Sequence, residues 1–212
     1  MHTTRIIRIA AFLTVAFALE GACAWSAEPA AGKIVTATGQ VSIQRGSAAP
    51  IGAKSGVAVR SGDRVITGAD GHVVIAMSDQ SQLELFSSSN FTIDQYGKDA
   101  DAPKRVGLFS GLLRSVVKAT GGAPANFQVH TPNAVAAVRG TEWYTGYSGN
   151  EERPGYLGCD RFTDISVLSG TVNVAAVQAP DQNMDVEPGH EATLPCDGPW
   201  VTGGRELPLP NH

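Results

Sequence analysis

Apolar and polar residues alternate with a period of two along most of this chain, and this pattern constrains the fold more than any other feature. From Lys33 onward, apolar residues recur at every second position in short runs. The runs include Val73, Ile75 and Met77; Leu83 and Leu85; Phe91 and Ile93; Phe127 and Val129; Ile165 and Val167; and Val172 and Val174. Successive side chains of a strand point to opposite faces of a sheet, so the alternation predicts strands with one buried face.

Turn signals separate these runs, among them Ser61-Gly62-Asp63, Ala69-Asp70-Gly71 and Ser169-Gly170. Many short strands at close spacing predict an all-β domain, either a compact sandwich or roll or a β-solenoid-like domain. The best helical candidate is Leu108 to Lys118. Its internal Gly111 and its pair of β-branched valines favour strand and turn instead.

Three segments differ from the alternating core. Tyr96 to Arg105 reads as a charged loop, Gly146 to Thr163 as a long insertion rich in Gly, Pro and Glu, and 197–212 as a Pro/Gly-rich tail that contains Trp200. We therefore expect one all-β domain over 32–196, interrupted at 146–163 and followed by the tail. A long loop in a compact domain is often functional, although it can equally be a tethered insertion.

The N-terminus has the parts of a secretory signal peptide. Two arginines precede an apolar run from Ile9 to Leu19, and small residues follow at 22–24. The run is about half of the ~20 residues that a membrane-spanning helix needs. We expect removal of residues 1–24, no stable membrane insertion, and a periplasmic or secreted mature chain. The alternatives are a retained N-terminal anchor and a lipoprotein acylated at Cys23.

The cysteines fit an oxidising compartment. Removal of residues 1–24 leaves Cys159 and Cys196, and an even number in an exported protein predicts a disulfide. Two unpaired buried thiols are the alternative. Metal binding by the pair with His130 or His190 is disfavoured, because neither cysteine has a second ligand at the spacing of a zinc finger.

Charge and motifs exclude several classes of function. The formal net charge of −4 provides nothing to neutralise a phosphate backbone, so no nucleic-acid partner is expected. The chain has no G-x-S-x-G motif, no phosphate-binding Gly loop, and no second histidine after His190-Glu191 to complete a zincin helix. His72, His130 and His190 are scattered through strand-like or turn sequence. We expect no enzyme, no cofactor and no metal site.

One stretch carries a family resemblance. Thr131 to Trp143 reads TPNAVAAVRGTEW and resembles the core motif of the FecR domain family, a T-P-x-A…V-R-G-T-x-F/W run before a G-x-V-x-V strand. Other segments are similar to further family features: Arg60–Gly71 to the G-D-x-V-x-T-G…G turn, Ser78–Leu85 to the L-x-L hairpin, Gly107–Leu113 to the paired-Gly strand, and Pro188–His190 to a late P-G turn. The similarity covers about Gly32 to Leu194.

The resemblance implies a periplasmic domain that receives a signal. The regulators for which the family is named join such a domain, through a membrane helix, to a cytoplasmic segment that controls a sigma factor. The domain itself receives its signal from an outer-membrane transporter. This chain departs from that layout, since its predicted signal peptide leaves no room for a cytoplasmic regulator. We expect a stand-alone exported FecR domain.

The motif residues have two interpretations. The family resemblance singles out Thr131, Pro132, Arg139, Gly140, Thr141 and Gly170. An exposed Arg139 guanidinium can bind a carboxylate or a sugar. The interpretation that we favour is structural, with Gly140 allowing close backbone approach and Arg139 pairing with an acid such as Asp63 or Asp79. The candidate binding residues are Arg139, Tyr144, Tyr147 and Trp200, with Tyr147 nearest the insertion.

Three functions remain to be compared. The first, which we favour, is a non-catalytic sensing or interaction domain that binds an envelope protein, with metal uptake or cell-surface signalling as the process it serves. The second is a glycan- or peptidoglycan-binding module that uses Tyr144, Tyr147 and Trp200. The third is a hydrolase, which the lack of a recognisable nucleophile–base pair disfavours.

Overall fold

The computed structural model describes residues 29–97, 102–118, 126–138, 140–196 and 198–203. Within these ranges every regular element is a strand, and all 17 strands belong to one hydrogen-bonded network. The prediction of an all-β domain of many short strands is confirmed. No helix in the described ranges is long and apolar enough to cross a membrane. The predicted signal peptide, 1–24, lies outside the described residues.

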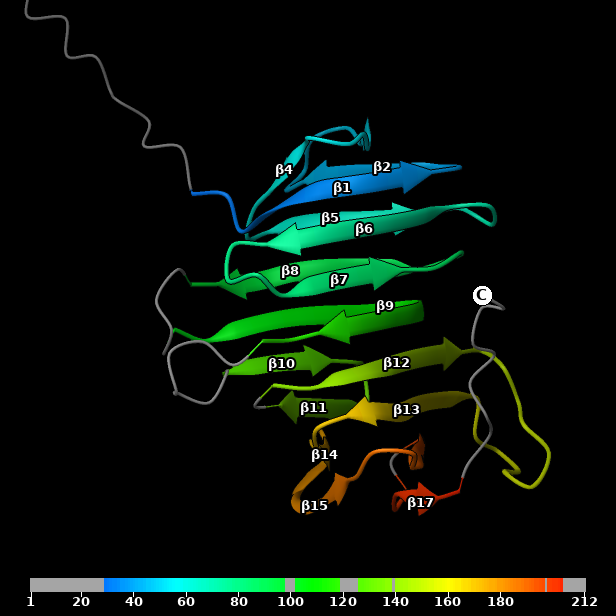
Figure 1. Ribbon diagram of the computed structural model, residues 1–212. Coiled ribbons are helices and arrows are strands. Elements are labelled where there is room, and N and C mark those ends of the chain that lie inside the picture. The colour runs from blue at the N-terminus through cyan, green and yellow to red at the C-terminus, as the bar shows by residue number, and fades with distance from the viewer. Residues whose placement is uncertain (1–28, 98–101, 119–125, 139, 197, 204–212) are drawn as a thin grey trace, which may run out of the picture.

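The strand pairings divide the network into two groups, which we call sheet A and sheet B. Sheet A runs in the order β4 (Ala58–Val59), β1 (Gly32–Thr38), β6 (His72–Met77), β7 (Gln82–Leu85), β9 (Lys104–Val116), β12 (Glu142–Gly149), β13 (Arg161–Ser169), β16 (Glu191–Pro195) and β17 (Val201–Thr202). Sheet B runs in the order β3 (Ile51–Gly52), β2 (Val41–Arg45), β5 (Asp63–Thr67), β8 (Asn90–Tyr96), β9, β10 (Phe127–His130), β11 (Ala134–Val138), β14 (Val172–Ala176) and β15 (Ala179–Val186). Figure 1 shows the two groups as two layers.

One strand, β9, belongs to both sheets. Its first half pairs with β8 in antiparallel fashion and with β10 in parallel fashion. Its second half, from Gly111 onward, pairs with β7 and β12 in sheet A. Gly111 has a φ of +88°, and a Cβ there would overlap Ser89. A glycine therefore allows the chain to pass from one sheet to the other at close range. The strand predicted within Leu108–Lys118 is confirmed.

The core lies between the two sheets and is built from the alternating residues. Every apolar run that predicted a strand has its inward members buried, and they form one continuous cluster with Trp143. Phe127 of sheet B meets Trp143 of sheet A edge to face, with ring centroids 5.9 Å apart. This aromatic contact joins the two layers.

A buried ion pair closes one end of the sandwich. The Lys104 side chain is 1% exposed, and its Nζ lies 3.2 Å from Oδ2 of Asp79 in the β6–β7 turn. Tyr96 donates its hydroxyl to the other oxygen of Asp79 at 2.7 Å. Burial alone raises the pKa of Asp79, but hydrogen bonds from Tyr96 and Ser81 and the charge of Lys104 outweigh it, so the pKa is lowered. Asp79 is thus held in its ionised form beside the Lys104 ammonium group.

Two segment boundaries differ from the sequence-based expectation. The insertion expected at 146–163 is shorter, because β12 continues to Gly149 and β13 begins at Arg161. Residues 150–160 form the connection, which we call the braced loop. The tail expected at 197–212 contains β17, which pairs with β16 at the edge of sheet A. Residues 197 and 204–212 lie outside the described ranges.

The crossing glycine provides a test of this architecture. Gly111→Ala is expected to lower the free energy of unfolding by about 2–4 kcal/mol, because it adds both a strained φ and an overlap with Ser89. Gly62→Ala is the matched control, with a φ of +80° and nothing within 4 Å of the added Cβ. Its expected cost is about 1 kcal/mol. Urea unfolding of the two variants, with the disulfide intact, measures both values; equal losses would contradict the role assigned to close approach at Gly111.

Candidate functional site

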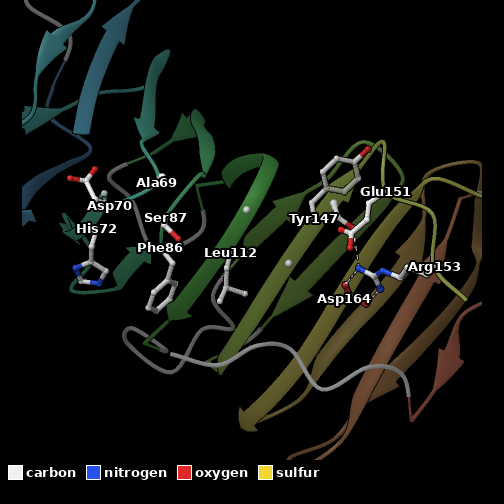
Figure 2. Close-up of a pocket in the computed structure, with 14 residues that line it drawn as sticks. Ala69, Asp70, His72, Phe86, Ser87, Leu112, Tyr147, Glu151, Arg153 and Asp164 are labelled. Atoms are coloured by element: carbon white, nitrogen blue, oxygen red, sulfur yellow. Dashed lines mark hydrogen bonds and ion pairs between the residues drawn. The ribbon is translucent and has the colours of Figure 1, made fainter. Parts of the chain in front are cut away.

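A groove crosses the outer face of sheet A, the face turned away from sheet B. Its cavity measures about 600 Å³. The described residues that line it are Ala69, Asp70, Gly71, His72, Phe86, Ser87, Gly111, Leu112, Gly146, Tyr147, Ser148, Glu151, Arg153 and Asp164. They come from the β5–β6 turn, β6, the β7–β8 turn, β9, β12, β13 and the braced loop, so segments far apart in sequence form one surface (Figure 2).

The floor of the groove is apolar because strand parity turns two large side chains outward. Leu85 and Leu113 enter the core, so their neighbours Phe86 and Leu112 face the opposite way. The Phe86 N–H donates to the carbonyl of Leu112 at 3.1 Å, and Figure 2 shows both side chains pointing in one direction. Gly146 adds no side chain to the floor. This leaves an open apolar surface in the middle of the sheet.

A network of charged groups borders the floor. Arg114 donates to Glu84 at 2.9 Å and to Glu142 at 3.0 Å, and His72 Nε2 lies 2.8 Å from the other oxygen of Glu84. Burial alone raises the pKa of Glu84, but hydrogen bonds from Arg114 and His72 outweigh it and lower that pKa. Phe86 packs beside His72, with ring centroids 5.5 Å apart. These charges are paired with one another across neighbouring strands.

The braced loop forms the opposite wall. Arg153 makes a two-pronged ion pair with Asp164 of β13, at 2.9 and 2.6 Å, and also donates to the Ser148 hydroxyl at 3.0 Å. Its guanidinium lies 4.1 Å from the centre of the Phe162 ring. Both side chains of the ion pair are nearly buried, so water competes little for its hydrogen bonds. Figure 2 shows this pair at one end of the groove.

The two cysteines tie the braced loop to the end of β16. Cys159 and Cys196 are at disulfide distance, with their Cα atoms 5.7 Å apart. The Cys196 N–H also donates to the carbonyl of Arg161 at 2.8 Å. The pairing expected from parity is therefore the one that the structure places together.

The groove favours binding over chemistry. The Ser148 hydroxyl accepts a hydrogen bond from the Arg153 guanidinium, which cannot act as a base toward it, and the same guanidinium pairs with Asp164. Burial raises the pKa of Tyr147, so its hydroxyl stays protonated on the rim. In the ranges described, no three His, Cys, Asp or Glu side chains are arranged to hold a metal ion. An apolar floor with polar edges suits the side chain of a partner.

The binding residues that the sequence suggested lie in different surroundings in the structure. Tyr147 lines the groove. Tyr144 is only 3% exposed and packs near Phe86, which corrects its interpretation as a free contact aromatic. Trp200 packs partly buried against the core, away from the groove lining. Arg139 lies outside the described residues, and Asp63 and Asp79, its suggested partners, pair with Arg45 and Lys104.

The Thr-Pro motif begins a buried hydrogen-bond network. The Thr131 hydroxyl lies 2.7 Å from that of Thr163 and accepts from the Ala134 N–H at 3.0 Å. Thr163 donates to Asn133, whose amide donates to the carbonyls of Leu194 and Cys196. The network joins the β10–β11 turn to β13 and β16. Pro132, beside it, is exposed.

The Gly-Thr part of the motif is also structural. Thr141 exchanges backbone hydrogen bonds with Val117 and donates its hydroxyl to the carbonyl of Thr171. Gly170 has a φ of +76°, and a Cβ there would meet the Gly140 carbonyl at 2.7 Å. Two turns from different parts of the chain therefore pack directly together. This arrangement supports the structural interpretation for these residues.

Comparison with known proteins identifies the family. A family model described as FecR protein matches residues 63–173, more than half of the chain. The chain therefore belongs to the FecR family, as the Thr131–Trp143 motif predicted.

Two crystal structures from Parabacteroides distasonis, each described as a candidate anti-sigma factor, resemble the fold. One shares 16% identity at a TM-score of 0.50, covering 68% of this chain and 60% of the other. The second shares 17% identity at a TM-score of 0.49, covering 66% and 58%. The chain thus spans about 60% of the length of these neighbours, and at this identity the likeness concerns the fold alone. No curated protein matches significantly.

The sequence alone does not reveal most of the groove, and Phe86, Leu112, Arg153 and Asp164 are absent from its candidate residues. The Leu112-Leu113 and Leu85-Phe86 pairs carry the available signal, because two consecutive apolar residues in a strand cannot both face the core. The Arg153–Asp164 pair has no such signal, since it depends on how the braced loop folds back over β13.

The Thr131 network predicts a specific loss of stability. Thr131→Val is expected to lower the free energy of unfolding by about 1–3 kcal/mol, because it leaves the buried Ala134 N–H without its acceptor. Thr131→Ser keeps the hydroxyl and should cost about 1 kcal/mol or less. Thermal and urea unfolding of both variants measure the difference. Equal destabilisation by the two would show that the methyl group, not the hydrogen bond, is what matters.

Proposed function

We propose that this chain is an exported, non-catalytic FecR-domain protein that binds a protein partner in the bacterial envelope and takes part in sensing or signalling there. The observation that carries the proposal is the groove over Phe86 and Leu112. It is an apolar surface left open on a sheet whose neighbouring charges are paired with one another. Exposed apolar surface rimmed by polar groups is typical of interaction sites.

Export is part of the proposal. The basic and apolar pattern of residues 1–24 favours a cleaved signal peptide, and the cysteine pair at disulfide distance is compatible with an oxidising compartment such as the periplasm. Family membership supports a sensing role, because the FecR resemblance implies a periplasmic domain that receives signals. A link to metal uptake belongs to the same proposal.

A glycan is the second candidate occupant of the groove. Tyr147 lines it beside Ser148 and Glu151, and an aromatic ring next to polar groups is a common surface for sugars. Tyr144 and Trp200 do not join Tyr147, which leaves a single lining tyrosine for stacking. Phe86 and Leu112 at the floor favour a protein side chain instead.

Site-specific photocrosslinking tests the proposal. Phe86 on the groove floor and Phe109 on the outer face of sheet B are each replaced by p-benzoyl-phenylalanine in the full chain. Phe109 is the matched control, because it is a phenylalanine that is 46% exposed on the other layer. After irradiation of the source bacterium, we expect a discrete protein adduct from position 86 and none from position 109.

Treatment of the adduct separates the two candidates. A protease-sensitive, lysozyme-resistant adduct supports a protein partner, and mass spectrometry then names it. A lysozyme-sensitive ladder from position 86 would replace the protein by peptidoglycan. Identical adducts from both positions, or none from either, would contradict binding through the groove.

A further inference from the structure

The braced loop consists of two consecutive tight turns. The Tyr156 N–H donates to the carbonyl of Arg153 at 3.1 Å, and the Cys159 N–H donates to the carbonyl of Tyr156 at 3.1 Å. The third positions of these turns are Gly155 and Gly158, with φ values of +88° and +76°. Glycine at that position with positive φ defines type II turns, for which the Pro-Gly pair of the first turn is well suited. The sequence RPGYLGC therefore encodes a defined loop shape.

The underside of the loop is fixed at three points. Arg153 is held by Asp164 and by the Phe162 ring. The Tyr156 ring meets Phe162 edge to face, with centroids 5.3 Å apart. Cys159 is joined to the end of β16. At its base, the Glu151 N–H donates to the carbonyl of Asp160 at 3.0 Å.

This rigid support ends in an exposed leucine. Leu157 occupies the second position of the second turn and is fully exposed, at 102% of its reference area. Among the large apolar residues exposed in the described ranges, the next, Val35 and Ile51, reach 48%. An exposed isobutyl group adds nothing to the buried core. The fold therefore explains the turns and the anchors but not the leucine that they present.

We propose that Leu157 is a docking anchor that enters an apolar pocket of the protein partner, and that this pocket has a basic rim. The inference rests on the proposed function, because it assigns one residue that the proposed protein partner contacts. A backbone already fixed by two turns and three anchors loses little conformational freedom on binding, which favours an anchor residue at its tip. Glu152 and Asp160 lie on the same loop and supply the acidic charge that a basic rim complements.

The acidic charge of the loop also disfavours two other binding partners for Leu157, a lipid surface and a second copy of this chain. Anionic lipid headgroups repel the acidic loop, and one leucine is too small an apolar surface for stable membrane attachment. A second copy of this chain would offer Leu157 a groove lined by Asp70 and Glu151, so acid would face acid. A protein with basic residues around an apolar pocket fits both features of the loop.

The test measures the affinity of full-length variants for the protein captured from position 86. Leu157→Ser is expected to weaken binding by about tenfold or more, and Leu157→Met to remain within about threefold of the wild type. Leu168→Ser is the matched control, because Leu168 is 45% exposed at the opposite end of β13. Its affinity should stay near that of the wild type. The melting temperatures of all three variants should match, since neither leucine is buried.

The outcomes separate this inference from the proposed function. If Leu157→Ser binds as tightly as the wild type, the anchor is wrong while the groove-binding partner stands. If position 86 captures no protein, both fail. Binding of the wild type, but not of Leu157→Ser, to vesicles of phosphatidylglycerol and phosphatidylethanolamine would assign the leucine to a membrane and overturn the protein pocket.

Discussion

The rest of the structure depends on β9 passing from one sheet to the other at Gly111. The crossing places the two halves of one strand at the centre of two layers, so the alternating apolar residues of both sheets meet in a single core. It also sets which side chains in the second half of β9 face outward. Once Leu113 enters the core, Leu112 must face outward, and the outer face of sheet A receives an apolar floor. The groove is thus a consequence of how the core is closed.

The charged side chains on this face are paired with one another, whereas its apolar floor is not covered. Arg114 is shared by Glu84 and Glu142, and Arg153 is held by Asp164. Burial alone raises the pKa of Glu84, but its hydrogen bonds to Arg114 and His72 lower that pKa, so this carboxylate is a poor proton acceptor. Pairs of this kind hold neighbouring strands in place. The apolar floor is left as the part of this surface that a partner can cover at a gain in free energy.

The sequence predicted the strands well but not the residues that gather on the outer face of sheet A, and both results have a physical reason. Val73, Ile75 and Met77 face the core as their alternation requires, because periodicity reports burial directly. Which of the two outer faces gathers Phe86, Leu112 and Arg153 depends on strand order, which local pattern does not encode. Tyr144 shows the same limit, since its burial beside Phe86 arises between strands that are distant in the sequence.

The central claim is that the outer face of sheet A, including the braced loop, is already shaped for docking before a partner arrives. Hydrogen exchange of the free protein and of its complex with the captured protein measures this most directly. In the free protein, the Tyr156 and Cys159 amides should exchange far more slowly than in an unstructured peptide, because their turns are formed. On binding, added protection should centre on 150–160 and the groove. Unprotected loop amides in the free protein, or added protection confined to sheet B, would contradict the claim.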